Sequence, residues 1–298
     1  MSFHGPIVAQ ARPISALRKR LRARVRSLLG KSPPARQPGP QGTQRRRVYV
    51  GTHHKSGTVW LRRIFHQIAK QEGFWMNYTP ALRAQSRQSM MIRFSGRSII
   101  PPGMRDDPNV RMVHLIRDPR DMLISATHYH LEATEPWLVE PVEAFGGLTY
   151  RERLSREPGM ESRLRFEMEH HHTEVLGDMT AWPWGRENVH EARYESLIAD
   201  REMREFRAIF AHLGFEADET ERALRVVWQS SLFGALDARK VRPHATAHIR
   251  SGRTGQWREV FTPDLARTYA ERHGDVLARL GYAADDAWVD ECTGGAAS

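Results

Sequence analysis

Lys55 stands among small and hydroxylated residues in a stretch that suits the binding of an anion. Residues 48–61 read V-Y-V-G-T-H-H-K-S-G-T-V-W-L, an apolar run that leads into a loop and then into a helix. The first N–H groups of a helix lack backbone partners, and the helix dipole favours negative charge there. Gly57 permits a close backbone approach. Ser56 and Thr58 add hydroxyl donors, and Lys55 adds a point charge. The segment therefore predicts an anion cradle.

The order of residues in this cradle bears on which enzymes it resembles. An ordinary P-loop places Gly-Lys-Ser/Thr after a glycine four residues earlier, whereas Lys55 here precedes Ser56 and Gly57. The sequence also lacks a recognisable Mg²⁺-binding acidic residue after a strand. A P-loop kinase-like phosphotransferase and a non-catalytic phosphonucleotide-binding adaptor stay open as alternatives.

A second basic position follows another apolar run. Residues 113–125 read V-H-L-I-R-D-P-R-D-M-L-I-S, so Arg117 ends a predicted strand and Ser125 lies in the next helix. Both can face the carboxyl edge of a parallel sheet, where ligands bind in open α/β folds. Arginine gives a bidentate grip on phosphate. The structural alternative is an ion pair between Arg117 and Asp118 or Asp121.

A third segment, residues 248–262, combines arginines with glycines near the end of the chain. It reads H-I-R-S-G-R-T-G-Q-W-R-E-V-F-T, which favours a flexible basic loop able to close over a phosphate. By itself the same pattern is equally typical of a surface loop.

Together these segments resemble the cytosolic-type sulfotransferase family over residues 47–282. The loop His54-Lys55-Ser56-Gly57-Thr58-Val59-Trp60-Leu61 is similar to the family's P-K-S-G-T-T-W-L, which holds a 5′-phosphosulfate. Arg117 and Ser125 resemble its 3′-phosphate pair. Residues 250–257, beginning Arg250-Ser251-Gly252, resemble its R-K-G-x-x-G-x-W segment at the same phosphate. Residues 193–197, R-Y-E-S-L, resemble R-Y-E-D-L, in which the tyrosine, here Tyr194, lies near adenine.

The resemblance implies a chemistry and a fold. It implies transfer of a sulfonate group from 3′-phosphoadenosine 5′-phosphosulfate (PAPS) to a hydroxyl or amine of an unidentified acceptor, with adenosine 3′,5′-bisphosphate (PAP) as product and no metal. The fold would be a P-loop NTPase-like α/β fold with a doubly wound, mostly parallel sheet and helices on both faces. Trp60 and Phe233 would lie at the adenine, and Lys55 would stabilise charge on the leaving phosphate oxygen.

The general base is the gap in this assignment. The family usually supplies it from a K-T-H segment, whose counterpart here is Arg93-Phe94-Ser95, without histidine. We take His54 as the first candidate and His53 as the second, since both adjoin the loop, with a purely structural role as the alternative. His114 is expected in the core, and His128 and His130 at the acceptor pocket. Residues 170–172 are histidines without other ligands at useful spacing, so no metal site is expected there.

Alternating strands and helices must position these residues. Apolar runs predict strands at 48–51, 73–77, 111–116 and 188–194. Helical spacing and proline or glycine boundaries predict helices at 58–70, 119–130, 200–213 and 263–279. This alternation is typical of a parallel, doubly wound sheet. Residues 76–110 and 130–185 would form the acceptor pocket.

Charge divides the chain into an arm and a body. The net charge is +10, but residues 1–47 hold twelve of the 45 Lys and Arg and no acidic residue, which leaves 33 basic against 35 acidic residues elsewhere. Apolar residues at helical spacing between the arginines of 13–29 favour a basic amphipathic helix, followed by a Pro/Gly-rich linker. That helix favours peripheral contact with an anionic membrane or an acidic partner; a transit peptide and a disordered tail are the alternatives.

These observations give a domain plan. Residues 1–46 are the basic arm and linker, 47–290 the sulfotransferase-like domain, and 291–298 a disordered tail. The near-neutral body argues against specific nucleic-acid binding. One cysteine and no long apolar run favour a cytoplasmic protein, peripheral to a membrane if the arm binds there. The acceptor, a small molecule or a glycan or lipid, and the oligomeric state are not specified by the pattern.

Overall fold

The protein is built on a five-stranded parallel sheet. The computed structural model describes residues 46–78, 89–230 and 252–294. Within them the strand order is β2-β3-β1-β4-β5, and every neighbouring pair is parallel. The strands are β1 (Arg46–Thr52), β2 (Trp75–Asn77), β3 (Met90–Ser95), β4 (Val110–Ile116) and β5 (Val189–Arg193). The predicted α/β class with a parallel, doubly wound sheet is confirmed.

Helices cover both faces of the sheet because its central strands are apolar on both sides. Val48 and Val50 of β1 pack into one core with residues of α2 (Thr58–Glu72), α10 (Arg204–His212) and α11 (Ala217–Ser230). Tyr49, between them, faces the other side and packs with Trp182 and with Met104 of α3 (Pro102–Arg105). The alternation along β1 therefore divides its side chains between two cores.

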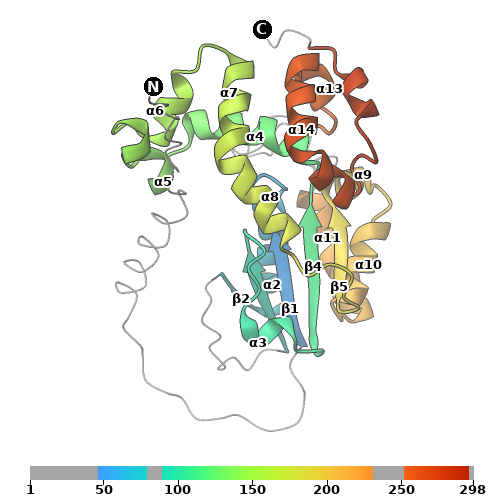
Figure 1. The fold of residues 1–298 in the computed structure, drawn as a ribbon. Coiled ribbons are helices and arrows are strands. Elements are labelled where there is room, and N and C mark those ends of the chain that lie inside the picture. Colours follow the sequence, from blue (N-terminus) through green and yellow to red (C-terminus); the bar gives the residue numbers. More distant parts are fainter. Residues whose placement is uncertain (1–45, 79–88, 231–251, 295–298) are drawn as a thin grey trace, which may run out of the picture.

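A helical cap lies beyond the carboxyl ends of the strands (Figure 1). One part is formed by helices that follow β4, and the other by helices near the end of the chain. The first part contains α4 (Pro119–Glu132), α5 (Pro136–Val139), η1 (Glu143–Phe145), α6 (Tyr150–Ser155), α7 (Met160–Glu167), η2 (Met168–His172) and α8 (Thr173–Thr180). The second contains α13 (Trp257–Val260), α14 (Pro263–Arg279) and η3 (Ala287–Glu291); α9 (Tyr194–Ala199) follows β5 directly.

The predicted elements are found with small shifts of their ends. The helix expected at 200–213 begins later, at Arg204, because Met203 adopts a left-handed conformation and the Asp200 carboxylate accepts the N–H groups of Arg204 and Phe206. Strand β3, helix α11 and the short helices α3, α5, α6, α7, α8, α9 and α13 were not predicted. The helix at 58–70 extends two residues, to Glu72.

Both proposed boundaries of the body also need adjustment. Strand β1 begins at Arg46, whose guanidinium donates to Glu219 and to the carbonyl of Gly214. The tail predicted from residue 291 is wrong for residues 291–294, because Cys292 is buried and the N–H of Gly294 donates to the carbonyl of Phe261. The predictions for residues 1–45, Phe233, Arg250 and Ser251 lie outside the described residues. Among the described helices, none has the length and apolar character needed to cross a membrane.

Candidate functional site

The loop between β1 and α2 is held in shape by its own hydroxyl groups. Ser56 and Thr58 both donate to the carbonyl of His53, at 2.9 and 2.7 Å, and the N–H of His53 donates back to Ser56. The sequence predicts these hydroxyls as ligand donors, and in the structure they also close the turn. The backbone amides and Lys55 are therefore the loop's main groups for an anion.

The backbone of this loop has an unusual conformation at two positions. Lys55 has φ 64° and Gly57 has φ 102°, and the left-handed region is rarely occupied by a non-glycine residue. Gly57 also lies against the ring of Tyr194, since a Cβ built there would approach that ring to 2.9 Å. No side chain caps the start of α2. Such backbone strain clusters at functional sites, and the uncapped helix start leaves N–H groups for an anion.

The amine of Lys55 lies over an aromatic ring. Its Nζ is 3.9 Å from the centroid of the Tyr129 ring, and the Tyr129 hydroxyl donates to Glu135. Burial first and the Arg117 charge second lower the pKa of Lys55 to about 8, while Glu135 opposes the shift. An anion beside Lys55 would favour its protonated form.

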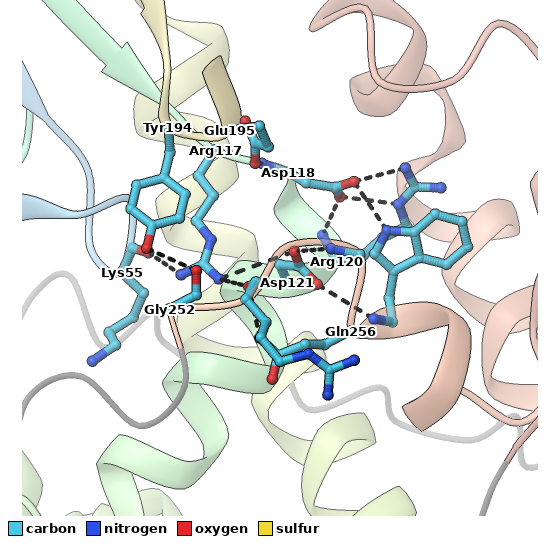
Figure 2. A network of polar contacts seen from close by, with 12 residues as sticks. Lys55, Arg117, Asp118, Arg120, Asp121, Tyr194, Glu195, Gly252 and Gln256 are labelled. Atoms are coloured by element: carbon cyan, nitrogen blue, oxygen red, sulfur yellow. Dashed lines mark hydrogen bonds and ion pairs between the residues drawn. The ribbon is translucent and has the colours of Figure 1, made fainter. Parts of the chain in front are cut away.

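Arg117 connects three segments that are far apart in the sequence. At the end of β4, it donates to the carbonyl of Lys55 (3.2 Å) and to the carbonyl of Arg253 (3.1 Å). Its guanidinium carbon lies 4.5 Å from the centroid of the Tyr194 ring, and the Tyr194 hydroxyl donates to the carbonyl of Gly252. Figure 2 shows Arg117 between Tyr194 and the 252–256 segment, with the Lys55 amine pointing away from it. The three segments singled out from the sequence thus meet at one guanidinium.

Two aspartates attach the 252–257 segment to the start of α4. Asp121 accepts the N–H groups of Gly255 (2.7 Å) and Trp257 (3.3 Å). Asp118 accepts the indole N–H of Trp257 (3.1 Å) and holds the buried guanidinium of Arg120 at 2.8 Å. The alternative pairing considered for Arg117 is therefore only marginally present, because its contact with Asp121 is 4.0 Å.

The other predicted binding residues have different surroundings. Ser125 is half-buried in α4, and Val59 is exposed on α2. Trp60 is buried; its indole donates to the carbonyl of Ser230 and its ring meets Tyr194 edge-on at 6.0 Å. The structure thus brings Trp60 and Tyr194 together, as expected for residues of one subsite.

His53 and His54 each end a chain of hydrogen bonds to a carboxylate. Nε2 of His53 lies 2.8 Å from Nε2 of His114, whose Nδ1 lies 2.6 Å from Glu191. Nε2 of His54 lies 3.0 Å from Nε2 of His130. His114 is fully buried, as predicted.

The second chain continues to Glu167 and includes a third histidine. Nδ1 of His130 lies 2.9 Å from Glu167, and the candidate ligand atoms of His54, His130 and His171 all lie within 4.8 Å of one another. In the described part of the chain this is a group with the spacing of a metal site. The sequence-based view that residues 170–172 have no partners at useful spacing is thus corrected, since the fold supplies partners from elsewhere.

Sequence reasoning missed Asp118, Asp121, Glu167 and Glu195 as residues that position this site. Glu195 accepts the N–H of Asp118 (2.9 Å) and the hydroxyl of Tyr282 (3.1 Å). The R-D-P-R-D run of residues 117–121 could have indicated the role of the aspartates. If Arg117 binds phosphate, the neighbouring carboxylates would need hydrogen-bond donors other than Arg117. Glu167 had no such signal, because its partners lie in other elements.

Comparisons with known proteins agree with this geometry. A family model described as a sulfotransferase domain matches residues 45–281. A mouse sulfotransferase complexed with PAP is similar in structure, with a TM-score of 0.53, 17% identity and coverage of 79% of this chain and 85% of that one. A retinol dehydratase in a complex with retinol and PAP is similar with a TM-score of 0.50 and 18% identity. The match covers 78% of this chain and 82% of that one. A comparison with curated proteins gives no match.

Proposed function

Since the chain belongs to the sulfotransferase domain family, and is therefore a sulfonate-transferring enzyme, we propose that its donor is PAPS and that the donor lies across the three segments joined by Arg117. The observation that carries this placement is the double hydrogen bond of Arg117 to the carbonyls of Lys55 and Arg253. The loop that contains Lys55 and the 252–257 segment thus lie on either side of one guanidinium, an arrangement that would suit a nucleotide with separate 5′ and 3′ phosphates.

The 5′-phosphosulfate would lie on the loop of residues 55–60, at the uncapped start of α2. The 3′-phosphate would bind Arg117, Ser125 and the Arg250-Ser251-Gly252 segment. The adenine would lie near Trp60 and Tyr194, with Phe233 as a further stacking residue. Each of these placements uses a residue that the sequence pattern singled out.

Catalysis by this site would be an in-line displacement at sulfur. The acceptor oxygen forms a bond to sulfur while the bond from sulfur to the 5′-phosphate oxygen breaks, and PAP leaves. Lys55 stabilises the negative charge that develops on that phosphate oxygen, and such preorganised charge is commonly the largest catalytic contribution. The acceptor hydroxyl loses a proton to a base, for which His54 is our candidate.

The acceptor itself is a hydroxyl or amine of a small molecule, glycan or lipid. The arm of residues 1–45 would add peripheral contact with an anionic membrane to the body that begins at Arg46, in a cytoplasmic protein. The basis of this is the ten basic residues of the arm and the amphipathic spacing at 13–29.

Calorimetric titration with PAP and with ADP tests the donor assignment. We expect PAP to bind more tightly than ADP, and Arg117→Ala to weaken PAP binding by roughly tenfold to a hundredfold, since hydrogen bonds to charged groups contribute about 1.5–3 kcal/mol. Arg111→Ala is the matched control, because Arg111 is an exposed arginine near the opposite end of β4. Equal affinity for PAP and ADP, or equal effects of the two substitutions, would refute the assignment.

A further inference from the structure

Three imidazoles from three elements meet beside the loop that carries Lys55. His54 belongs to that loop, His130 to α4 and His171 to the π-helical segment η2. The ring centroids are 5.0 Å apart for His54 and His130, 4.8 Å for His54 and His171, and 5.0 Å for His130 and His171. The three rings therefore form a nearly equilateral group.

The ring nitrogens of this group have the spacing that one metal ion requires. One nitrogen from each ring can be chosen so that all three lie within 4.8 Å of one another, and Nε2 of His54 lies 3.0 Å from Nε2 of His130. Zinc–nitrogen bonds of about 2.0–2.1 Å at tetrahedral angles place two nitrogens about 3.4 Å apart. A small rotation of the rings would therefore admit the ion.

Glu167 lies behind two of the rings and gives them the partner that metal-binding histidines commonly have. Its side chain has no exposed surface, and its oxygens lie 2.9 Å from Nδ1 of His130 and 3.5 Å from Nδ1 of His171. A histidine that binds a metal through one nitrogen commonly donates the N–H of the other to a carboxylate. Since Nδ1 of both rings lies beside Glu167, Nε2 of both is directed away from the carboxylate.

The local structure of η2 is a second observation at this place. Residues Met168–His172 are π-helical between α7 and α8, and π-helical turns occur frequently at functional sites. His171 lies in this turn and Glu167 directly precedes it. Both residues contact His130 of α4, His171 through its ring and Glu167 through a hydrogen bond.

The surroundings of the group leave one side for an ion to enter. His130 and His171 are buried, and Trp137 stacks on His171 with a centroid distance of 4.7 Å. Behind them, the Tyr150 hydroxyl donates to Glu167 at 2.9 Å. His54 is only half-buried, so an ion would enter past its ring.

We propose that His54, His130 and His171 form a binding site for one Zn²⁺ ion, with Glu167 as the residue that orients two of the rings. Imidazole suits Zn²⁺, whereas Ca²⁺ and Mg²⁺ bind oxygen ligands. Three histidines leave the fourth tetrahedral position for water. Binding replaces the hydrogen bond between His54 and His130 by two metal–nitrogen bonds, and His54 then carries its one proton on Nδ1.

This ion would oppose the role proposed for His54 as a base. With Nε2 bound to zinc and a proton on Nδ1, the ring has no lone pair left to accept the proton of the acceptor. Zinc would therefore inhibit sulfonate transfer, and the metal-free chain would be the active form. This consequence rests on the proposed function, whereas the ion site itself does not.

His53 and His114 provide a comparison within the same protein. Their Nε2 atoms are 2.8 Å apart, and Nδ1 of His114 lies 2.6 Å from Glu191. The order of groups is thus the same as from His54 to Glu167. Among the described residues, however, no further side chain completes this pair to a group with the spacing of a metal site. We therefore expect no zinc there.

Calorimetric titration with Zn²⁺ of the full, untagged chain, freed of metal by a chelator, tests the site. We expect one ion per chain. His171→Gln should weaken zinc binding by at least about a hundredfold and Glu167→Gln by about tenfold to a hundredfold, the range seen when the partners of metal-bound histidines are lost. His170→Gln, at the adjacent half-buried histidine, is the matched control and should leave the affinity unchanged, as should His114→Gln. Melting curves show whether each variant is folded.

Spectroscopy of the wild-type chain needs no variant. Co²⁺ in place of Zn²⁺ absorbs visible light strongly in a four-coordinate site and weakly in a six-coordinate one. We expect the four-coordinate spectrum, and its loss when one equivalent of Zn²⁺ is added. Nitrogen-15 NMR of the zinc-loaded chain should show the proton of His54 on Nδ1. A lone pair on either nitrogen of His54 in that state would refute the exclusion of this ring as a base.

Three results would overturn the zinc site: no stoichiometric zinc binding, a six-coordinate Co²⁺ spectrum, or equal effects of His171→Gln and His170→Gln. None of them depends on the donor. The titrations with PAP and ADP are made on the metal-free chain, so unselective binding there would refute the proposed donor while leaving the zinc measurements valid.

Discussion

At the scale of single residues, Lys55 has three unusual features, in its backbone conformation, in the position of its amine and in the contact of its carbonyl. Its left-handed backbone is strained, its half-buried side chain places the amine above Tyr129, and its carbonyl accepts a hydrogen bond from Arg117. Desolvation makes the charge costly when the site is empty, whereas an anion repays that cost on binding. We infer that ligand charge and the Lys55 proton are coupled, and this has a measurable sign.

PAP affinity should fall as pH rises above about 8. Lys55 is protonated below that pKa, and the phosphate dianion raises its pKa in the complex. Between the two values binding takes up a proton, so Kd rises by up to about tenfold per pH unit. Phosphate itself titrates near pH 6 and does not contribute in this range. Calorimetric titrations from pH 7 to 10 measure the slope.

Lys55→Arg is the control for this pH dependence. A guanidinium stays charged throughout the range, so its affinity for PAP should be weaker at pH 7 but flat with pH. A slope in Lys55→Arg equal to that of wild type would assign the titration to another group.

The single residues that could be predicted from the sequence are those in contiguous motifs. Lys55, Gly57 and Arg117 are found where the motifs put them. The contacts of Ser56 and Thr58 were not predictable, because a hydroxyl near a ligand loop can contact either the ligand or the loop, and here both donate to the carbonyl of His53. The role of Glu167 was not predictable from the sequence, since it depends on the contacts of its carboxylate with His130 and His171, which come from other parts of the fold.

At the scale of elements, the turn from β4 into α4 joins several segments of the proposed donor site. Asp118 caps α4 by accepting the N–H of Arg120, and it also accepts from the Arg120 guanidinium and the Trp257 indole. One carboxylate therefore fixes the helix start, a buried cation and the segment that approaches Arg117. Loss of this carboxylate should affect stability and ligand binding together.

Asp118→Ala should lower the free energy of unfolding by about 3–5 kcal/mol, because Arg120 would be a buried charge without its anion. Urea unfolding with an unchanged m value measures this loss. The same substitution should weaken PAP binding, since Trp257 loses its anchor.

Glu221→Ala is the matched comparison for that loss. It removes the carboxylate of an ion pair with Arg207 whose side chains are both 53% exposed. Such pairs contribute little, so no measurable change is expected. A similar loss in both variants would show that the burial of Arg120 is not the cause.

Elements were predictable where the pattern was strong and local. Strands β1 and β4 are apolar runs bounded by loops or prolines, and α14 has a clear helical period between its proline and Gly281. Strand β3 was missed because its short run contains Arg93, which looks polar until the neighbouring strands bury it. The late start of α10 depends on the Asp200 carboxylate, which accepts the N–H groups of Arg204 and Phe206, and hydrophobic spacing does not predict such a contact.

At the scale of the whole molecule, the charge of the chain is concentrated outside the body. The described body starts at Arg46, which is tied to Glu219 and the carbonyl of Gly214 within the same body. The donor site is likewise built from residues after 52. These contacts all join described residues of the body, so we expect arm and body to be separable in function.

Deletion of residues 1–44 should therefore leave the melting temperature and PAP affinity unchanged while abolishing binding to anionic lipid vesicles. The physical reason is that the arm carries the excess basic charge, whereas the rest of the chain is nearly neutral. A triple substitution of Leu17, Leu21 and Leu28 by serine keeps every charge but removes the apolar face. If the arm binds as an amphipathic helix, both variants should lose co-sedimentation with vesicles. If only the deletion loses it, charge alone is responsible; if neither does, the arm is not a membrane contact.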